Sequence, residues 1–182
     1  MVKINLGSAS RLIPGFINLD IEPNPGAIKW DIRNGVPFED VEFINISQCF
    51  EHLNLFEARA LLKECYNVLN INGIIKISVP DMDILIEYMK NGKMDYFANI
   101  QPDFFSKGLK SQMIKLGIMG IGNMSNDSTR EHFTGHQLLL NFDALKELLE
   151  ESGFRDIKRV NFNPFYDHVV CSEHSVFVEA TK

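Results

Sequence analysis

Residues Lys3–Asp20 read KINLGSASRLIPGFINLD, and this stretch decides the fold. A short apolar strand leads into Gly7, Ser8 and Ala9, whose small or absent side chains let a ligand approach the backbone closely. A second strand ends on Asp20, whose ionised carboxylate can accept hydrogen bonds from two neighbouring hydroxyls. The stretch therefore outlines a nucleotide-type cofactor site. An ordinary strand, turn and strand with a turn glycine is the alternative.

Length and composition favour one soluble domain. The chain has 182 residues, 45% of them hydrophobic and 23% charged, which is ordinary for a globular protein. No apolar run approaches the ~20 residues that cross a bilayer, and the opening MVKINLG lacks the regions of a secretory signal. We therefore expect a single cytoplasmic domain over residues 1–182 with no membrane partner. The three cysteines are too scattered for a disulfide framework or a zinc site, and no metal is expected.

The charge balance argues against a nucleic-acid partner. The formal net charge is −6, whereas phosphate binding favours lysine and arginine clustered on one face. Lys107, Lys110 and Lys115 form the only loose basic cluster, and we interpret it as a solvated helix face.

Short apolar runs alternate with helical patterns, which predicts an α/β fold with a mostly parallel sheet. The expected strands are Val2–Leu6, Phe16–Asp20, Ile28–Asp31, Glu42–Ser47, Ile74–Val79, Phe154–Phe162 and Ser175–Ala180. The expected helices are Glu57–Leu69, Asp83–Lys90 and one that Asn141 caps and Gly153 ends. Ligands of open α/β sheets bind outside the carboxyl ends of the strands, so we expect the site there.

Residues 83–135 are interpreted as a helical insertion that forms a lid. The segment has embedded glycines among isoleucines and methionines, and its pattern indicates no particular chemistry. His132 and His136 lie at its end and are candidates for a general base from the lid side. A structural contact with the lid is the alternative for His136. The oligomeric state stays open.

Taken together, six motifs in order resemble the class I S-adenosylmethionine-dependent methyltransferases over most of the chain. INLGSAS resembles the glycine motif of that family, and INLD resembles its second strand with the ribose-binding acid. WDIRNGVPF, ISQCFEHL and LNINGIIKISVPD are similar to the segments around its next three strands. HQLLLNFDALKELLEESGF, with the later HSVFVEATK, resembles its last helix and terminal strands. The resemblance implies a three-layer α/β sandwich whose seven-stranded, mostly parallel sheet has an antiparallel last strand.

The resemblance also implies S-adenosylmethionine as the cofactor. In it, Asp20 would bind the ribose, Asp31 would face the adenine amino group, and the Ile32 backbone would face the ring. The full implied set is Asn5, Gly7, Ser8, Ala9, Asp20, Ile21, Asp31, Ile32, Ser47 and Gln48. Residues 8–19 are too few for the usual first helix, and the chain resembles a branch in which a loop, here Pro14–Gly15, replaces it.

Methyl transfer needs mainly alignment, with a base only where the acceptor must lose a proton. His52 and Asp81 are the candidate catalytic residues. A backbone contact is the alternative for His52, and a helix cap is the alternative for Asp81. The leading hypothesis is a methyltransferase for a small-molecule or sugar-like, glycan-type acceptor.

Two further hypotheses come from other classes. Asn5 stands where the family usually has an acid, and Ala9 stands where it usually has a second glycine. These departures motivate a non-catalytic member of the same fold that binds cofactor or a partner. An enzyme for a dinucleotide or a nucleotide sugar is the third hypothesis, and the missing phosphate-facing helix argues against it.

Overall fold

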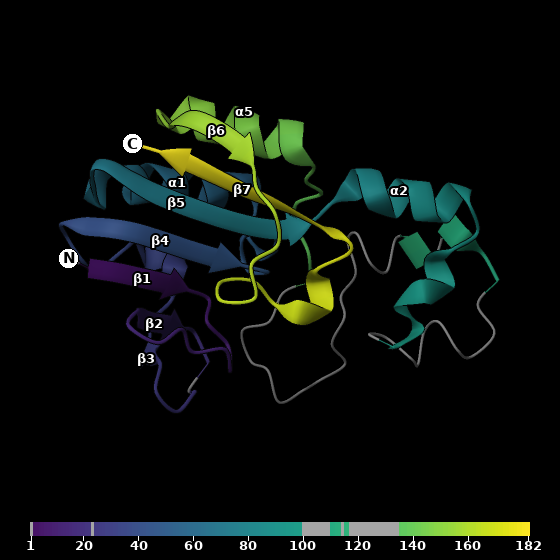
Figure 1. The fold of residues 1–182 in the computed structure, drawn as a ribbon, viewed down its shortest axis with the longest axis horizontal. Coiled ribbons are helices and arrows are strands. Elements are labelled where there is room, and N and C mark those ends of the chain that lie inside the picture. Colours follow the sequence, from purple (N-terminus) through teal and green to yellow (C-terminus); the bar gives the residue numbers. More distant parts are fainter. Residues whose placement is uncertain (1, 23, 100–109, 114, 117–134) are drawn as a thin grey trace.

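The computed structural model describes residues 2–22, 24–99, 110–113, 115–116 and 135–182, and these form an α/β fold around one sheet (Figure 1). Its seven strands lie in the order β3-β2-β1-β4-β5-β7-β6. They are β1 (Val2–Leu6), β2 (Ile17–Asp20), β3 (Ile28–Lys29), β4 (Val41–Ser47), β5 (Leu69–Pro80), β6 (Arg155–Arg159) and β7 (Ser175–Thr181). β7 runs antiparallel to both of its neighbours, whereas β1 to β5 are mutually parallel. The predicted sheet with its antiparallel last strand is therefore confirmed.

Helical segments connect these strands. The α-helices are α1 (Leu55–Val68), α2 (Met82–Lys90) and α5 (Phe142–Ser152). Short 3-10 turns are η1 (Ile32–Asn34), η2 (Phe50–His52), η3 (Met94–Asn99) and η4 (Val169–Cys171). Between β1 and β2 the chain forms no helix, as residues 8–19 predict.

The largest difference from the predicted elements is at β5, which begins at Leu69 rather than Ile74. Its pairing with β4 jumps from Leu69 to Ile74, so the intervening residues bulge out of the ladder. Asn72 in this bulge has φ +65°, and its N–H donates to the carbonyl of Lys182 at 3.3 Å. The predicted asparagine–glycine turn is therefore present, but it lies inside the strand and not before it.

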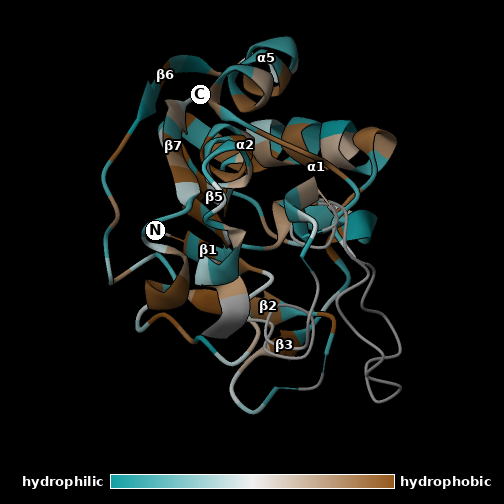
Figure 2. Cartoon of the chain, turned by 90° about the vertical axis from the view of Figure 1, so that its right-hand side faces the viewer, coloured by the Kyte–Doolittle hydropathy of each residue, from teal (hydrophilic) through white to brown (hydrophobic). Residues whose placement is uncertain are grey.

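One face of the sheet packs against α1 and α5 to form the main core. Alternate strand residues such as Ile4, Ile44 and Ile75 are fully buried there, against Leu62 of α1 and Leu149 of α5. Figure 2 shows hydrophilic and hydrophobic residues mixed along both helices, as expected where only one side of a helix packs on a sheet. The helix patterns of the sequence therefore place this layer correctly.

The opposite face of the sheet carries both polar and aromatic side chains, and the segment of residues 160–174 lies over it (Figure 1). The Lys76 ammonium on β5 contacts both carboxylate oxygens of Asp167 at 2.6 and 2.8 Å, and both side chains are buried. Asn45 on β4 donates to the carbonyl of Tyr166 at 3.3 Å. This layer is therefore mostly loop, and buried polar contacts help to hold it on the sheet. A loop needs such contacts because, unlike a helix, it does not pair its own backbone N–H and C=O groups.

α2 and η3 extend beyond the carboxyl ends of the strands and fall within the predicted lid, 83–135 (Figure 1). A small second core joins them around Leu85, Met94 and Phe97. Lys115 is 2% exposed and pairs with Asp95, so the interpretation of this lysine as part of a solvated face was wrong.

Most of the remaining residues of the predicted lid lie outside the described residues, and these include Lys107 and His132. The lid therefore stays a prediction. Among the helices that the structure describes, none is long and apolar enough to cross a membrane.

Candidate functional site

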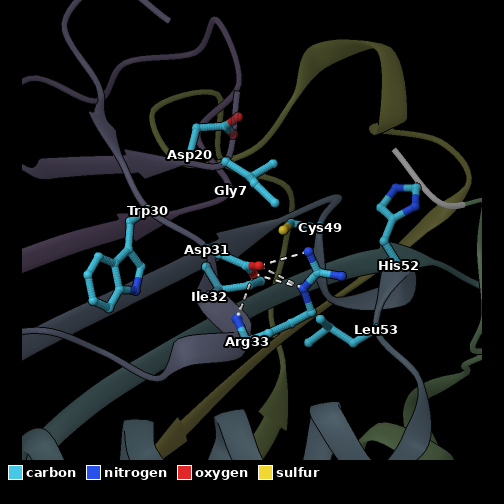
Figure 3. A pocket seen from close by; sticks show the side chains of 10 residues that line it. Gly7, Asp20, Trp30, Asp31, Ile32, Arg33, Cys49, His52 and Leu53 are labelled. Carbon is cyan, nitrogen blue, oxygen red and sulfur yellow. Dashed lines mark hydrogen bonds and ion pairs between the residues drawn. The ribbon is translucent and has the colours of Figure 1, made fainter. Parts of the chain in front are cut away.

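A pocket opens at the carboxyl ends of β1, β2 and β4 (Figure 3). It holds about 480 Å³ free of protein atoms, a figure that includes space open to solvent. Its lining residues are Gly7, Asp20, Ile21, Trp30, Asp31, Ile32, Arg33, Cys49, His52 and Leu53. The pocket therefore lies where the strand order predicts a ligand site.

Gly7 forms the floor of the pocket, directly after β1. It has φ +66°, and a Cβ built on it would lie 2.2 Å from the Cys49 Sγ. Both the backbone conformation and the close approach of Cys49 therefore require glycine here. Burial raises the pKa of the Cys49 thiol, so this thiol stays protonated and is a packing group rather than a nucleophile.

Asp20 ends β2 with its carboxylate folded against the glycine loop. Oδ2 accepts from the Ala9 N–H at 2.7 Å, and Oδ1 accepts from the Glu22 N–H at 2.9 Å. Ala9 has φ +45°, a left-handed conformation at the position where the related motif has glycine. Asn24 Nδ2 also donates to Oδ1 at 3.3 Å, so Asp20 shapes the loop while it lines the pocket, and Oδ2 keeps a lone pair for a hydroxyl donor.

The segment after β3 forms another wall of the pocket. Asp31 caps η1, and its carboxylate is held by the Arg33 guanidinium, with Nη2 2.7 Å from Oδ2 (Figure 3). This hydrogen-bonded pair raises the pKa of Arg33. Trp30 stands beside them, and its Nε1 donates to the carbonyl of Gly35 at 2.9 Å. The wall thus offers a planar indole, a carboxylate and a cation at one place.

Five residues of the implied cofactor set do not line the pocket. Asn5 is buried on the polar face of the sheet, where it bonds Arg11, Asn18 and Asn45. The backbone of Ser8 and Ala9 belongs to the glycine loop, with the Ser8 N–H donating to Leu19 O at 2.9 Å.

The remaining two of these five, Ser47 and Gln48, face neighbouring strands. The Ser47 hydroxyl accepts from Ser78 at 2.9 Å, and the Gln48 amide donates to Ser175 at 3.2 Å. The side chains of Ser47 and Gln48 therefore bond other strands of the sheet and do not line the pocket.

η2 brings Glu51 and His52 together with His136, which lies far along the chain. One potential ligand atom from each of the three residues lies within 4.8 Å of the others. The Glu51 carbonyl accepts from the N–H groups of Gln137 and Leu138 at 2.8 and 3.1 Å, which ties the later segment to η2. Burial raises the pKa of Glu51 to about 8. His52 alone of the three also lines the pocket, as Figure 3 shows.

Asp81 lies apart from the pocket lining, at the end of β5. Its Oδ1 accepts from the Asp83 N–H at 3.0 Å and caps α2, and its Oδ2 lies 3.2 Å from Nη1 of Arg159. Both carboxylate oxygens therefore serve the fold. This geometry supports the helix-cap alternative for Asp81.

Sequence reasoning missed four pocket residues, namely Trp30, Arg33, Cys49 and Leu53. All four lie inside the quoted motifs WDIRNGVPF and ISQCFEHL, next to residues that the resemblance had assigned. Their position in the sequence could have identified them, because residues next to a ligand-binding loop usually line the same cavity.

No protein-family model matches the chain, and no curated protein matches its sequence. Many solved structures match its fold. One is a methyltransferase of Thermotoga maritima, described as a possible histamine N-methyltransferase, with a TM-score of 0.55 and 15% identity. The match covers 100% of this chain and 82% of that one.

A second match, an S-adenosylmethionine-dependent methyltransferase of Archaeoglobus fulgidus, has a TM-score of 0.55 and 15% identity, and it covers 99% and 85% of the two chains. Human N-acetylserotonin methyltransferase in complex with S-adenosylmethionine has a TM-score of 0.52 and 13% identity over 100% of this chain and 47% of its own. The chain therefore has the fold of the class I S-adenosylmethionine-dependent methyltransferases.

Proposed function

We propose that this protein is an S-adenosylmethionine-dependent methyltransferase for a small-molecule or sugar-like acceptor. The observation that carries the proposal is the pocket in which Gly7, Asp20 and Asp31 meet at the carboxyl ends of three strands. The fold supports it, because the structures that the chain resembles include several S-adenosylmethionine-dependent methyltransferases.

The residues of the pocket fit such a cofactor. A side chain at position 7 would collide with Cys49, so glycine lets the loop after β1 pack closely on this neighbouring pocket residue. Asp20 would accept from the ribose hydroxyls, and Trp30 and Ile32 offer an apolar surface for the adenine ring. The cofactor carries the reactive methyl group when bound, and the protein supplies orientation and exclusion of water.

Asp31 would face the adenine amino group, and in this structure Arg33 covers it. Adenine binding therefore requires the guanidinium to rotate away, and Arg33 lies on the surface with 38% of its side chain exposed. An exposed ion pair is worth about 0–1 kcal/mol, so its opening costs the cofactor little affinity.

His52 is proposed as the residue that acts on the acceptor, because it lines the pocket at the end opposite Trp30 (Figure 3). Its imidazole would hold or remove a proton where the acceptor is a hydroxyl. Asp81 is proposed as a positioning residue, since its carboxylate caps α2 directly after β5.

Calorimetric titration with S-adenosylmethionine and S-adenosylhomocysteine tests the cofactor site. Micromolar binding to the wild type should be lost in Asp20→Ala and weakened in Asp20→Asn, and it should persist in the exposed control Glu39→Ala. Circular dichroism confirms that each variant is folded. Unchanged affinity in Asp20→Ala would refute the assignment of the ribose site.

A non-catalytic cofactor-binding protein is the second candidate, and two observations favour it. Ala9 holds a left-handed backbone where glycine would be relaxed, and Arg33 already occupies the Asp31 carboxylate. This candidate expects weak binding and no turnover. Methyl transfer from labelled cofactor to any acceptor of a hydroxyl or amine panel would eliminate it.

A further inference from the structure

We propose that Glu51, His52 and His136 form a binding site for one divalent transition-metal ion of the zinc type, beside the pocket. Two imidazoles and one carboxylate are a ligand set that zinc and related ions accept, with positions left for water or substrate. The three potential ligand atoms lie within 4.8 Å of one another.

The distances are those of a nearly assembled site. His136 Nε2 and Glu51 Oε1 are 4.0 Å apart. Two ligand atoms at ~2.0–2.1 Å from a tetrahedral ion lie about 3.3 Å from each other. The Glu51–His136 pair would therefore have to close by about 0.7 Å, and a pair at the 4.8 Å limit by about 1.5 Å, distances that side-chain rotations can supply.

The buried carboxylate is the second, independent observation. Glu51 is 2% exposed, and its Oε2 has no hydrogen-bond partner among the described residues. A buried carboxylate oxygen without a partner is costly, and proteins rarely keep one without a compensating contact. A cation bound between Glu51 and the two histidines would supply that contact.

The backbone around the cluster holds the ligands in place. Two N–H groups of the 137–138 segment donate to the Glu51 carbonyl, and the Gln137 side chain donates to the His52 carbonyl at 2.9 Å. The rings of His52 and His136 are 4.9 Å apart between centroids, in an edge-to-face arrangement. These contacts fix a ligand from residue 136 onto the η2 turn, although the two are more than eighty residues apart in the chain.

The position of His52 connects the ion to the proposed chemistry. His52 belongs both to the cluster and to the pocket wall, so an ion bound there would lie beside the cofactor pocket. A zinc-type ion holds an acceptor oxygen and lowers the pKa of a bound hydroxyl. This role rests on the proposed function, whereas binding of the ion does not.

Metal binding by the purified full chain, without cofactor, tests the site. We expect one Co²⁺ per chain with visible absorption bands of a nitrogen–oxygen site, and competition by Zn²⁺. Glu51→Gln and His136→Ala should each lower Zn²⁺ affinity by more than the about 10–100-fold that outer-shell changes cause. The exposed His168→Ala is the matched control and should bind as the wild type does.

Two results would overturn the metal site. One is the absence of stoichiometric binding to the wild type, and the other is binding that Glu51→Gln and His136→Ala leave intact. Circular dichroism shows whether each variant is folded, and S-adenosylmethionine titration is run separately, because neither residue lines the pocket. Metal binding without any cofactor binding would overturn the proposed function and leave the metal site standing.

Discussion

Removal of the Lys76 ammonium should destabilise the protein more than any surface change. Lys76 and Asp167 are 1% and 0% exposed and contact each other at 2.6 Å. Breaking a buried ion pair from one side costs about 3–5 kcal/mol, because the remaining charge stays buried without its partner. Domains are stable by only about 5–15 kcal/mol, so Lys76→Met should remove a large part of the unfolding free energy.

Urea denaturation of the wild type, two single variants, their double variant and one control variant measures this effect. Lys76→Met and Asp167→Asn should each be costly, and the double variant should cost less than their sum, with a coupling of about 1–3 kcal/mol. Lys146→Met is the control, because its pair with Glu150 is exposed and 3.6 Å long, and it should cost below about 0.5 kcal/mol. A loss below about 1 kcal/mol in Lys76→Met, or strict additivity, would refute the reasoning.

Two further predictions concern polar groups of the fold. Asn5→Asp restores the acid that the related motif usually carries, yet it removes the amide donor to Arg11 O and Asn18 Oδ1. Urea denaturation should therefore show an unfolding free energy lower by about 1–3 kcal/mol. A gain in stability would contradict the role of this hydrogen-bond network. His174 is buried and neutral, and desolvation lowers its pKa below the ordinary 6.5. The unfolded chain binds the proton more readily, so the unfolding free energy should fall as pH decreases below 6.5. The pH dependence should flatten in His174→Gln and not in His168→Gln.

Local signals in the sequence predicted the helices and strands well where their physical cause is local. Asn141 was expected to cap a helix, and its Oδ1 accepts from the Ala144 N–H at 3.0 Å. Gly153 was expected to end that helix, and it has the left-handed φ of +103°. Each of these features depends on a few neighbouring residues, so periodicity and capping rules reach them.

Contacts between distant segments were beyond such rules. Lys76 lies in a strand whose alternation favours an exposed side chain, and it is buried only because Asp167 folds over it. Asn5 was expected at the cofactor, and its side chain also bonds two other asparagines of the sheet, which no local pattern indicates. The meeting of Glu51 with His136 depends on where the segment after the lid returns to η2, which no local pattern encodes.

The short loop between β1 and β2 explains two of the buried asparagines of this sheet, Asn5 and Asn18. A helix satisfies its own backbone, whereas the loop between β1 and β2 leaves N–H and C=O groups that water cannot reach. Asn18 accepts from the Ile13 N–H at 2.9 Å and donates to the carbonyls of Ile13 and Phe16, and Asn5 donates to Arg11 O. An apolar residue at either position would leave these loop groups unpaired. The short first connection therefore accounts for Asn5 and Asn18, whereas Asn45 and Lys76 on the same face bond the 160–174 segment.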